Sequence, residues 1–196
     1  MQGTLQKCFA TGILLAAWVC WLQAAAPHGW FLAGSKPANY ETGIDPEASY
    51  HDAHSAFLKS KTPDLENEGS GFGTLMQSFR AEQYLGKRVR LTGYIKSAAV
   101  REWAGLWMRV DKGSSSVAFD NMQDRAIKGT TDWHRYEVVL DVPKDATGIS
   151  FGVLLAGPGA VWLNSTSFEV VESDVPTTGR DGGTLPDRPT NLNFKE

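Results

Sequence analysis

An all-β fold, built as an antiparallel sandwich of about eight to ten strands, is the fold class that this sequence predicts. In several successive stretches apolar and polar residues alternate with a period of two, which is typical of strands with one buried and one solvated face. Short segments rich in Gly, Pro, Asn and Asp separate these stretches. Beyond residue 26 no stretch shows the apolar spacing of a long amphipathic helix, so strands must supply the core.

This alternation also places the individual strands. A short apolar segment at residues 28–33 predicts a first strand, and the turn-forming residues at 34–49 predict a long loop after it. Further strands are expected at residues 50–61, 71–81, 86–111 (as two strands), 117–120, 129–143, 146–156 and 161–171.

The first 26 residues have the features of an export signal. An uncharged apolar run covers residues 8–22, and the small residues at 24–26 follow it, which is the pattern of a signal-peptidase site after a hydrophobic helix. The alternative is an uncleaved anchor, because the run extended to residue 26 approaches the ~20 residues of a membrane helix. We therefore expect a periplasmic or secreted protein, or one that is anchored in the membrane through residues 8–26.

The rest of the chain is long enough for one domain. We expect the sandwich over residues 27–172 and a flexible polar tail over residues 173–196, which are rich in Pro, Gly, Thr and Asp. Both cysteines, Cys8 and Cys20, lie in the expected signal, so a mature chain would contain neither a disulfide nor a thiolate metal site. It would have a net charge of −4 without a basic cluster, which argues against nucleic acid as a partner.

A candidate binding face lies in the second half of the stretch 86–111. There Ala104, Leu106, Met108 and Val110 form an apolar row, so the opposite face carries Trp103, Trp107, Arg109 and Asp111. Aromatic rings beside a cation and a carboxylate can bind a flat or polyhydroxylated molecule, and Gly105 would leave room for it. The alternative interpretation is that a neighbouring loop covers Trp107 and that Arg109 and Asp111 form an ordinary ion pair.

Three further residues are candidates for the same site. Tyr94 lies on the polar row of the preceding strand, and Asp120 and Gln123 belong to a polar segment at a strand end. The alternative for this segment is a solvated connection whose Asp and Asn side chains cap turns. The expected ligand-binding residues are therefore Trp107, Arg109, Trp103, Tyr94, Asp111, Asp120 and Gln123.

The sequence contains no catalytic motif. The carboxylates could be paired, for example Asp111 with Asp120 or Glu102 with Asp124, but no motif fixes their geometry. Serine-nucleophile patterns and phosphate-binding loops are missing, so we expect no enzyme and no cofactor. His51 and His54 are three residues apart, which places them on opposite faces of a strand, and no metal site is expected there.

Several segments resemble known domains. The strings GKRVRLTGYIKS, TTDWHRYEVVLDVP and VWLNSTSFEVV resemble the strand order of galactose-binding-like jelly rolls, which include carbohydrate-binding modules of secreted glycosidases. The strings GWFLAGSKPANYE, GFGTLMQ, WAGLWMRVD, AFDNMQDR and KGTTDW resemble an uncharacterised bacterial domain that is also attached to arabinose-activator-type transcription regulators. The resemblance to this bacterial domain covers nearly the whole chain after the signal.

The resemblance implies a jelly-roll topology and sugar binding through aromatic side chains, here Trp103, Trp107 and Tyr94. Such modules often contain a structural calcium ion, but Asn164 and Ser165 stand where related modules often have an acidic pair, which disfavours calcium. We expect an exported, non-catalytic binding domain for a carbohydrate or other small polar ligand. The alternative is a protein-interaction or ligand-sensing accessory domain, because aromatic residues with arginine also form protein-binding hot spots.

Overall fold

The fold is described from a computed structural model of the 196-residue chain. The structure describes residues 25–51, 53–62 and 71–179. The expected signal helix lies outside these residues. Within the described ranges, no helix is long and apolar enough to cross a membrane.

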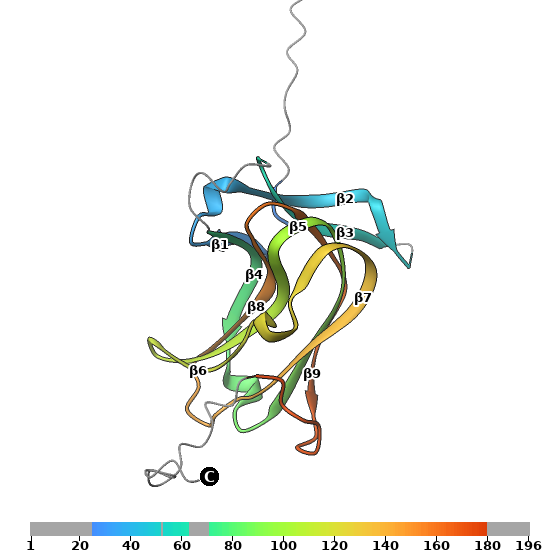
Figure 1. The fold of residues 1–196 in the computed structure, drawn as a ribbon. Coiled ribbons are helices and arrows are strands. Elements are labelled where there is room, and N and C mark those ends of the chain that lie inside the picture. Colours follow the sequence, from blue (N-terminus) through green and yellow to red (C-terminus); the bar gives the residue numbers. More distant parts are fainter. Residues whose placement is uncertain (1–24, 52, 63–70, 180–196) are drawn as a thin grey trace, which may run out of the picture.

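The described residues form nine strands, all paired antiparallel, and three single-turn 3-10 helices (Figure 1). The all-β prediction is therefore confirmed. The strands are β1 Phe31–Gly34, β2 Tyr40–Tyr50, β3 Ala53–Ser60, β4 Phe72–Arg80, β5 Arg88–Lys112, β6 Ser115–Asp120, β7 Ile127–Asp141, β8 Gly148–Ala156 and β9 Ala160–Val171, and the 3-10 helices are η1 Pro37–Asn39, η3 Glu82–Tyr84 and η4 Gln123–Arg125.

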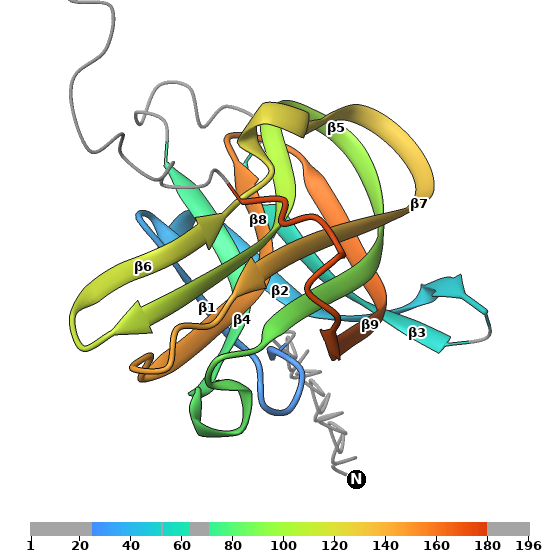
Figure 2. The same ribbon diagram turned by 90° about the horizontal axis from the view of Figure 1, so that it is seen from below.

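The nine strands belong to one curled sheet in which β5 is shared between two layers. The N-terminal half of β5 pairs with β7 and β9, and β3 and β2 follow β9; we call these strands the first layer. The C-terminal half of β5 pairs with β8 and β6, and β4 and β1 follow β8; we call these strands the second layer. Figure 2 shows β5 in green, running through both layers.

The expectation of two separate strands in residues 86–111 was wrong, because no turn interrupts β5. The strand instead bends where Ala99 adopts a left-handed conformation, with a φ of 50°. The pairing register with β7 shifts between Ser97 and Val100 and again between Val100 and Ala104. Such bulges bend a strand without ending it.

The core lies between the two layers and follows the predicted alternation of β5. Val89, Leu91 and Ile95 of its first half are fully buried. The same holds for Leu106 and Met108 of its second half. Apolar residues of the other strands complete this core, including Leu58, Leu75, Val138, Leu140, Ile149, Val153, Leu155 and Val161.

The expectation of a long loop at residues 34–49 was also wrong, because most of this segment forms β2. β2 is the edge strand of the first layer and pairs with β3 alone. An edge strand tolerates proline, whose missing N–H can face solvent. Pro46 lies where the pairing register shifts between Asp45 and Tyr50, so it removes no ladder hydrogen bond in the regular part of the strand.

Residues 172–179 follow β9 and cross β7 (Figure 2, red). The Thr178 N–H donates to Val139 O at 3.0 Å, and the Val139 N–H donates to Thr178 Oγ1 at 2.8 Å. Arg88 donates to the carbonyl oxygens of Ser173 and Val175, each at 2.6 Å. These contacts fix the start of the segment that was expected to be a tail, whereas residues 180–196 lie outside the described residues.

Candidate functional site

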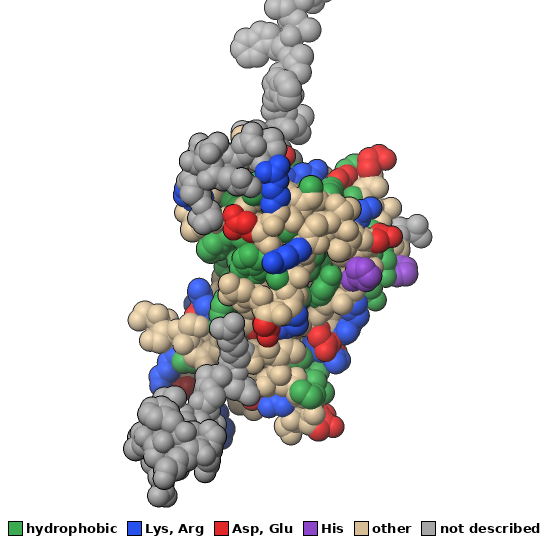
Figure 3. All heavy atoms as spheres, in the orientation of Figure 1, with side chains coloured by type: hydrophobic (Ala, Val, Ile, Leu, Met, Phe, Trp, Pro, Cys, Tyr) green, Lys and Arg blue, Asp and Glu red, His purple; other side chains and the backbone are tan. Residues whose placement is uncertain are grey.

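The outer face of the second layer carries a groove of about 460 Å³. β1 and β6 are the two edge strands of this layer, and β4 and β8 lie between them (Figure 1). In Figure 3 the left flank of the molecule is indented between β1 and β6, and hydrophobic side chains, in green, gather in the indentation. We call this feature the groove; its floor is formed by Thr74, Met76, Trp107 and Leu154, its walls by Phe31 and Phe119, and Arg109 also lines it.

Trp107 is a fixed part of the groove floor. The residue is 6% exposed, and its side chain packs with Met76, Leu154 and Ala156. The indole Nε1–H donates to Thr74 Oγ1 at 2.7 Å, and the Thr74 hydroxyl in turn donates to the Val153 carbonyl oxygen at 2.9 Å. Buried indole N–H groups need such a partner. The neighbouring strands therefore cover most of Trp107, so it is not the open stacking surface that the sequence suggested.

The exposed aromatic rings of the groove are Phe31 and Phe119. Phe31 of β1 is 44% exposed and Phe119 of β6 is 43% exposed. Sequence reasoning did not select either residue. The alternation of β6 could have found Phe119, because it points away from the buried Asp120, but the position of Phe31 depends on long-range pairing with β4.

An ion pair lies at the end of the groove. Arg109 Nε donates to the Asp111 carboxylate, with distances of 2.9 and 3.0 Å to its two oxygens. Arg109 is 43% exposed in its side chain and Asp111 is 20% exposed. Ser150 of β8 lies opposite Arg109, and its hydroxyl is 2.8 Å from that of Ser78. The structure thus brings Trp107, Arg109 and Asp111 together on one face, in agreement with the alternation of β5.

Trp103 belongs to the same face but does not itself line the groove. It packs against the apolar cluster that contains Trp107 and Ala156. The space over Gly105 is filled, because a Cβ atom there would lie 2.7 Å from Asn121 O. The expectation that Gly105 leaves room for a ligand between the two tryptophans was therefore wrong.

Tyr94 lies in the first layer, away from the groove. It pairs with residues of β7 and β9, and its ring packs against Tyr50 with 4.5 Å between centroids. Trp133 lies 5.4 Å from the same Tyr50 ring. Tyr94 therefore belongs to an aromatic cluster on another face of the molecule.

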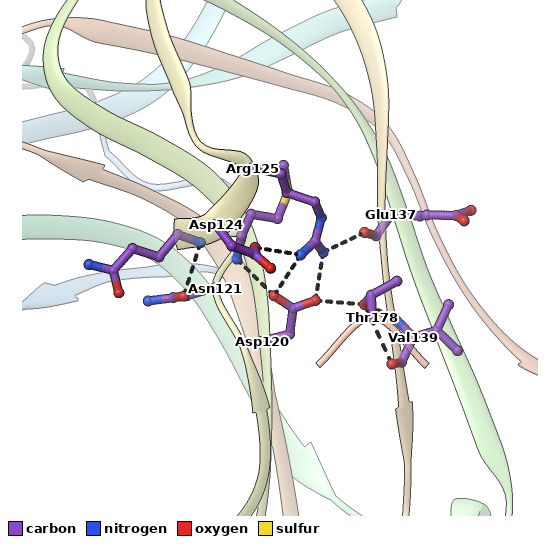
Figure 4. Close-up of polar contacts among 9 residues, drawn as sticks. Asp120, Asn121, Asp124, Arg125, Glu137, Val139 and Thr178 are labelled. Carbon is purple, nitrogen blue, oxygen red and sulfur yellow. Dashed lines mark hydrogen bonds and ion pairs between the residues drawn. The ribbon is translucent and has the colours of Figure 1, made fainter. Parts of the chain in front are cut away.

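Asp120 holds a turn together (Figure 4). Its side chain is 5% exposed, and its carboxylate accepts hydrogen bonds from Arg125 Nη2 at 2.6 Å and from Arg125 Nη1 at 3.2 Å. The Met122 N–H donates to the same carboxylate at 2.8 Å, and the Thr178 hydroxyl donates to it at 2.6 Å. With four donors satisfied, this carboxylate has little capacity left for a ligand. Gln123 is exposed in the adjacent 3-10 turn and does not line the groove.

No metal centre can be assembled from the described part of the chain, which contains no group of three His, Cys, Asp or Glu side chains close enough to bind one ion. His51 is exposed in the turn between β2 and β3, and His54 is exposed near the start of β3.

Comparison with solved structures defines the class of fold. The xylan-binding CBM22-1 domain of Paenibacillus barcinonensis Xyn10C superimposes with a TM-score of 0.51 at 14% identity, covering 77% of this chain and 91% of that domain. The C-terminal family 22 carbohydrate-binding module of Clostridium thermocellum Xyn10B gives a TM-score of 0.51 at 12% identity, covering 76% of this chain and 89% of that module. The enzymatically active domain of bacteriophage CBA120 tailspike protein 4 gives a TM-score of 0.52 at 15% identity, covering 74% of this chain and 20% of the tailspike chain. The chain therefore has the β-sandwich fold of these carbohydrate-binding modules.

A curated relative is similar in sequence as well. The chain is 47% identical over 170 residues to YbfP of Bacillus subtilis (strain 168), an uncharacterised helix-turn-helix-type transcriptional regulator. The alignment covers 86% of this chain and 57% of the regulator, so the chain spans little more than half of the relative's length. No family model matches the chain. The predicted resemblance to carbohydrate-binding jelly rolls and to a regulator-attached domain is confirmed.

Proposed function

We propose that this domain binds a carbohydrate or another small polar ligand in the groove, without catalysing a reaction. The observation that carries the proposal is the pair of half-exposed rings, Phe31 and Phe119, on either side of an apolar floor. Sugar rings have apolar faces that pack on aromatic side chains, and the nearby Arg109, Asp111, Ser78 and Ser150 can form hydrogen bonds with hydroxyl groups. Two modules that share the fold are carbohydrate-binding or xylan-binding by name.

The chemistry of the groove favours binding over catalysis. Among the described residues that line it, Arg109 is the one charged side chain. General acid–base catalysis needs a pair of titratable groups within reach of the reacting atoms. Asp111 is held by Arg109, and Asp120 is saturated by Arg125, Met122 and Thr178.

The cellular setting is a separate part of the proposal. The sequence of residues 1–26 supports export. The binding domain then covers residues 27–172, with Asp111, Arg109 and Trp107 in its site. The second candidate is a ligand-sensing accessory domain, and the relationship to a transcriptional regulator favours it. Both settings use the same groove, so one binding experiment serves both.

Isothermal titration calorimetry against soluble xylo-, gluco-, manno- and galacto-oligosaccharides and their acidic counterparts tests the proposal. Replacing Phe119 or Phe31 by Ala should weaken binding by about tenfold, since one aromatic contact contributes about 1 kcal/mol. Val170→Ala is the matched control, because Val170 is 47% exposed on β9 of the first layer. The proposal fails if no saccharide binds, or if the control weakens binding as much as Phe119→Ala.

A further inference from the structure

Arg109 is oriented so that part of its hydrogen-bonding capacity remains available in the groove. Its Nε–H is engaged by Asp111, at 2.9 and 3.0 Å from the two carboxylate oxygens. The terminal Nη1 and Nη2 atoms make no hydrogen bond to any described residue, and the side chain is 43% exposed. A guanidinium group fixed at Nε presents its terminal N–H groups in a planar arrangement that matches the two oxygens of a carboxylate.

The charges around Arg109 favour an anion. The described lining of the groove contains no carboxylate, and its charged member is Arg109. Arg80 of β4 lies on the same face, opposite Gly148, which in turn lies opposite Asp111 of β5. Arg80 is exposed and has no ion pair within the described part of the chain. This end of the groove thus has two cations, Arg109 and Arg80, and one carboxylate, Asp111, which pairs with Arg109, although the chain as a whole has a net charge of −3.

The floor adds a second requirement, because a small inorganic anion would leave it empty. Met76, Leu154 and Trp107 form an apolar surface next to the Arg109 end, and Phe31 and Phe119 bound it. A ligand that uses both parts has a ring with an apolar face and a carboxylate attached to it. Volumes of this size accommodate a small organic ligand or a short oligomer.

We propose that the ligand of the groove is an acidic carbohydrate, a saccharide with a uronic acid unit whose carboxylate is bound by Arg109. This inference rests on the proposed carbohydrate-binding function and specifies the class of its ligand. Arg109 contributes a charge-assisted, bidentate pair, Arg80 adds favourable long-range attraction, and the apolar floor with its two phenylalanines receives the sugar ring. Asp111 acts as a positioning residue that holds the guanidinium plane.

The test compares saccharides of the same sugar units whose carboxyl groups are either ionised or methyl-esterified. Short oligomers of galacturonate, glucuronate and mannuronate are titrated beside the same oligomers with methyl-esterified carboxylates, by calorimetry at low and high NaCl. We expect one acid to bind about tenfold more tightly than its ester, because hydrogen bonds to ionised partners are stronger than neutral ones. This preference should shrink at high salt. Sodium acetate and sodium sulfate serve as free anions.

Substitutions then assign the preference to Arg109. Arg109→Gln should bring the acid to the affinity of its ester, and Arg109→Lys should keep part of the preference, since it retains the charge without the planar geometry. Arg135→Gln is the matched control, because Arg135 is 45% exposed and also paired with a carboxylate, on β7 of the first layer. Circular dichroism and the thermal midpoint confirm that each variant folds.

The outcomes separate the two proposals. If neutral saccharides or esters bind as tightly as the acids, or Arg109→Gln leaves the preference unchanged, the acidic-ligand inference is overturned while carbohydrate binding stands. If acetate or sulfate displaces the acid at equal concentration, the groove is a plain anion site, and the inference is overturned as well. If neither acidic nor neutral saccharides bind, the proposed function itself fails.

Discussion

Phe119 and Asp120 are consecutive residues of β6, yet their side chains belong to different parts of the molecule. Phe119 forms a wall of the groove and is 43% exposed, whereas the Asp120 side chain is 5% exposed and is hydrogen-bonded to Arg125 and Thr178. The period of two in a strand produces this division. The position of the groove wall therefore depends on a strand that a buried polar network holds in place.

The first prediction concerns this network. Asp120→Ala leaves the Met122 N–H, the Thr178 hydroxyl and the Arg125 guanidinium without their acceptor. We expect the free energy of unfolding to fall by about 2–3 kcal/mol, less than the roughly 3–5 kcal/mol for breaking a fully buried ion pair, because Arg125 is partly exposed. Urea unfolding measures this change. Asp124→Ala is the control, because Asp124 pairs with the same arginine at 3.1 Å but is 57% exposed, and it should cost less than about 1 kcal/mol.

The second prediction concerns residues 172–179. Thr178→Val keeps the shape of the side chain but removes the acceptor of the Val139 N–H and one donor to Asp120. We expect the free energy of unfolding to fall by about 1–2 kcal/mol and hydrogen exchange at Val139 to become faster, since a backbone N–H loses its partner. Thr178→Ser should restore most of the protection. Unchanged exchange at Val139 in the valine variant would show that the segment does not protect β7.

The third prediction concerns the groove floor. Thr74→Val deprives the Trp107 Nε1–H of its acceptor in a site where both side chains are buried. We expect a destabilisation of about 1–3 kcal/mol, the cost of an unsatisfied buried donor. Thr74→Ser keeps the hydroxyl and should lower the free energy of unfolding by about 1 kcal/mol or less, because it removes one methyl group. Equal stability of the two variants in urea unfolding would contradict the assigned hydrogen bond.

The fourth prediction concerns acid stability. The Trp162 Nε1–H donates to Asp45 at 2.7 Å, and this hydrogen bond lowers the pKa of the Asp45 carboxyl below its ordinary value of 3.8. A group whose pKa is lower in the folded state stabilises the fold above the unfolded pKa, and this stabilisation is lost as the pH falls through the folded pKa. Asp45→Asn should therefore be less stable than the native chain at neutral pH.

The difference between the two chains should shrink as the pH falls below 3.8 and disappear once the pH is below the lowered pKa of the folded carboxyl. Thermal midpoints measured across the acid range check this expectation. Glu47→Gln serves as the control, because Glu47 is exposed on the same strand. A constant difference between native and Asp45→Asn chains at all pH values would contradict the role given to Trp162.

Local alternation was sufficient to predict much of the fold. It placed the buried rows of β5 correctly, because one face of each half packs against the core between the layers. It failed at β2, whose Gly, Pro and Asp residues are typical of loops, because pairing with β3 overrides local preference in an edge strand. The continuity of β5 was missed for a related reason, since the bulged bend at Ala99 shifts the register within the strand and interrupts the alternation without a turn.

The candidate site was harder to predict than the fold. Trp107, Arg109 and Asp111 share a face because they alternate on one strand, and this follows from sequence alone. Tyr94 was grouped with them although the bend in β5 places it in the other layer. Phe31 could not be found, because its place opposite Met76 depends on the order of strands in the layer.

The bend in β5 also has a consequence for how the molecule comes apart. Because one unbroken strand belongs to both layers, neither layer can separate from the other without losing half of that strand's pairing. We therefore expect the two layers to melt in a single cooperative transition, with no stable half-molecule in between. The groove would then keep its shape up to the temperature at which the whole domain unfolds.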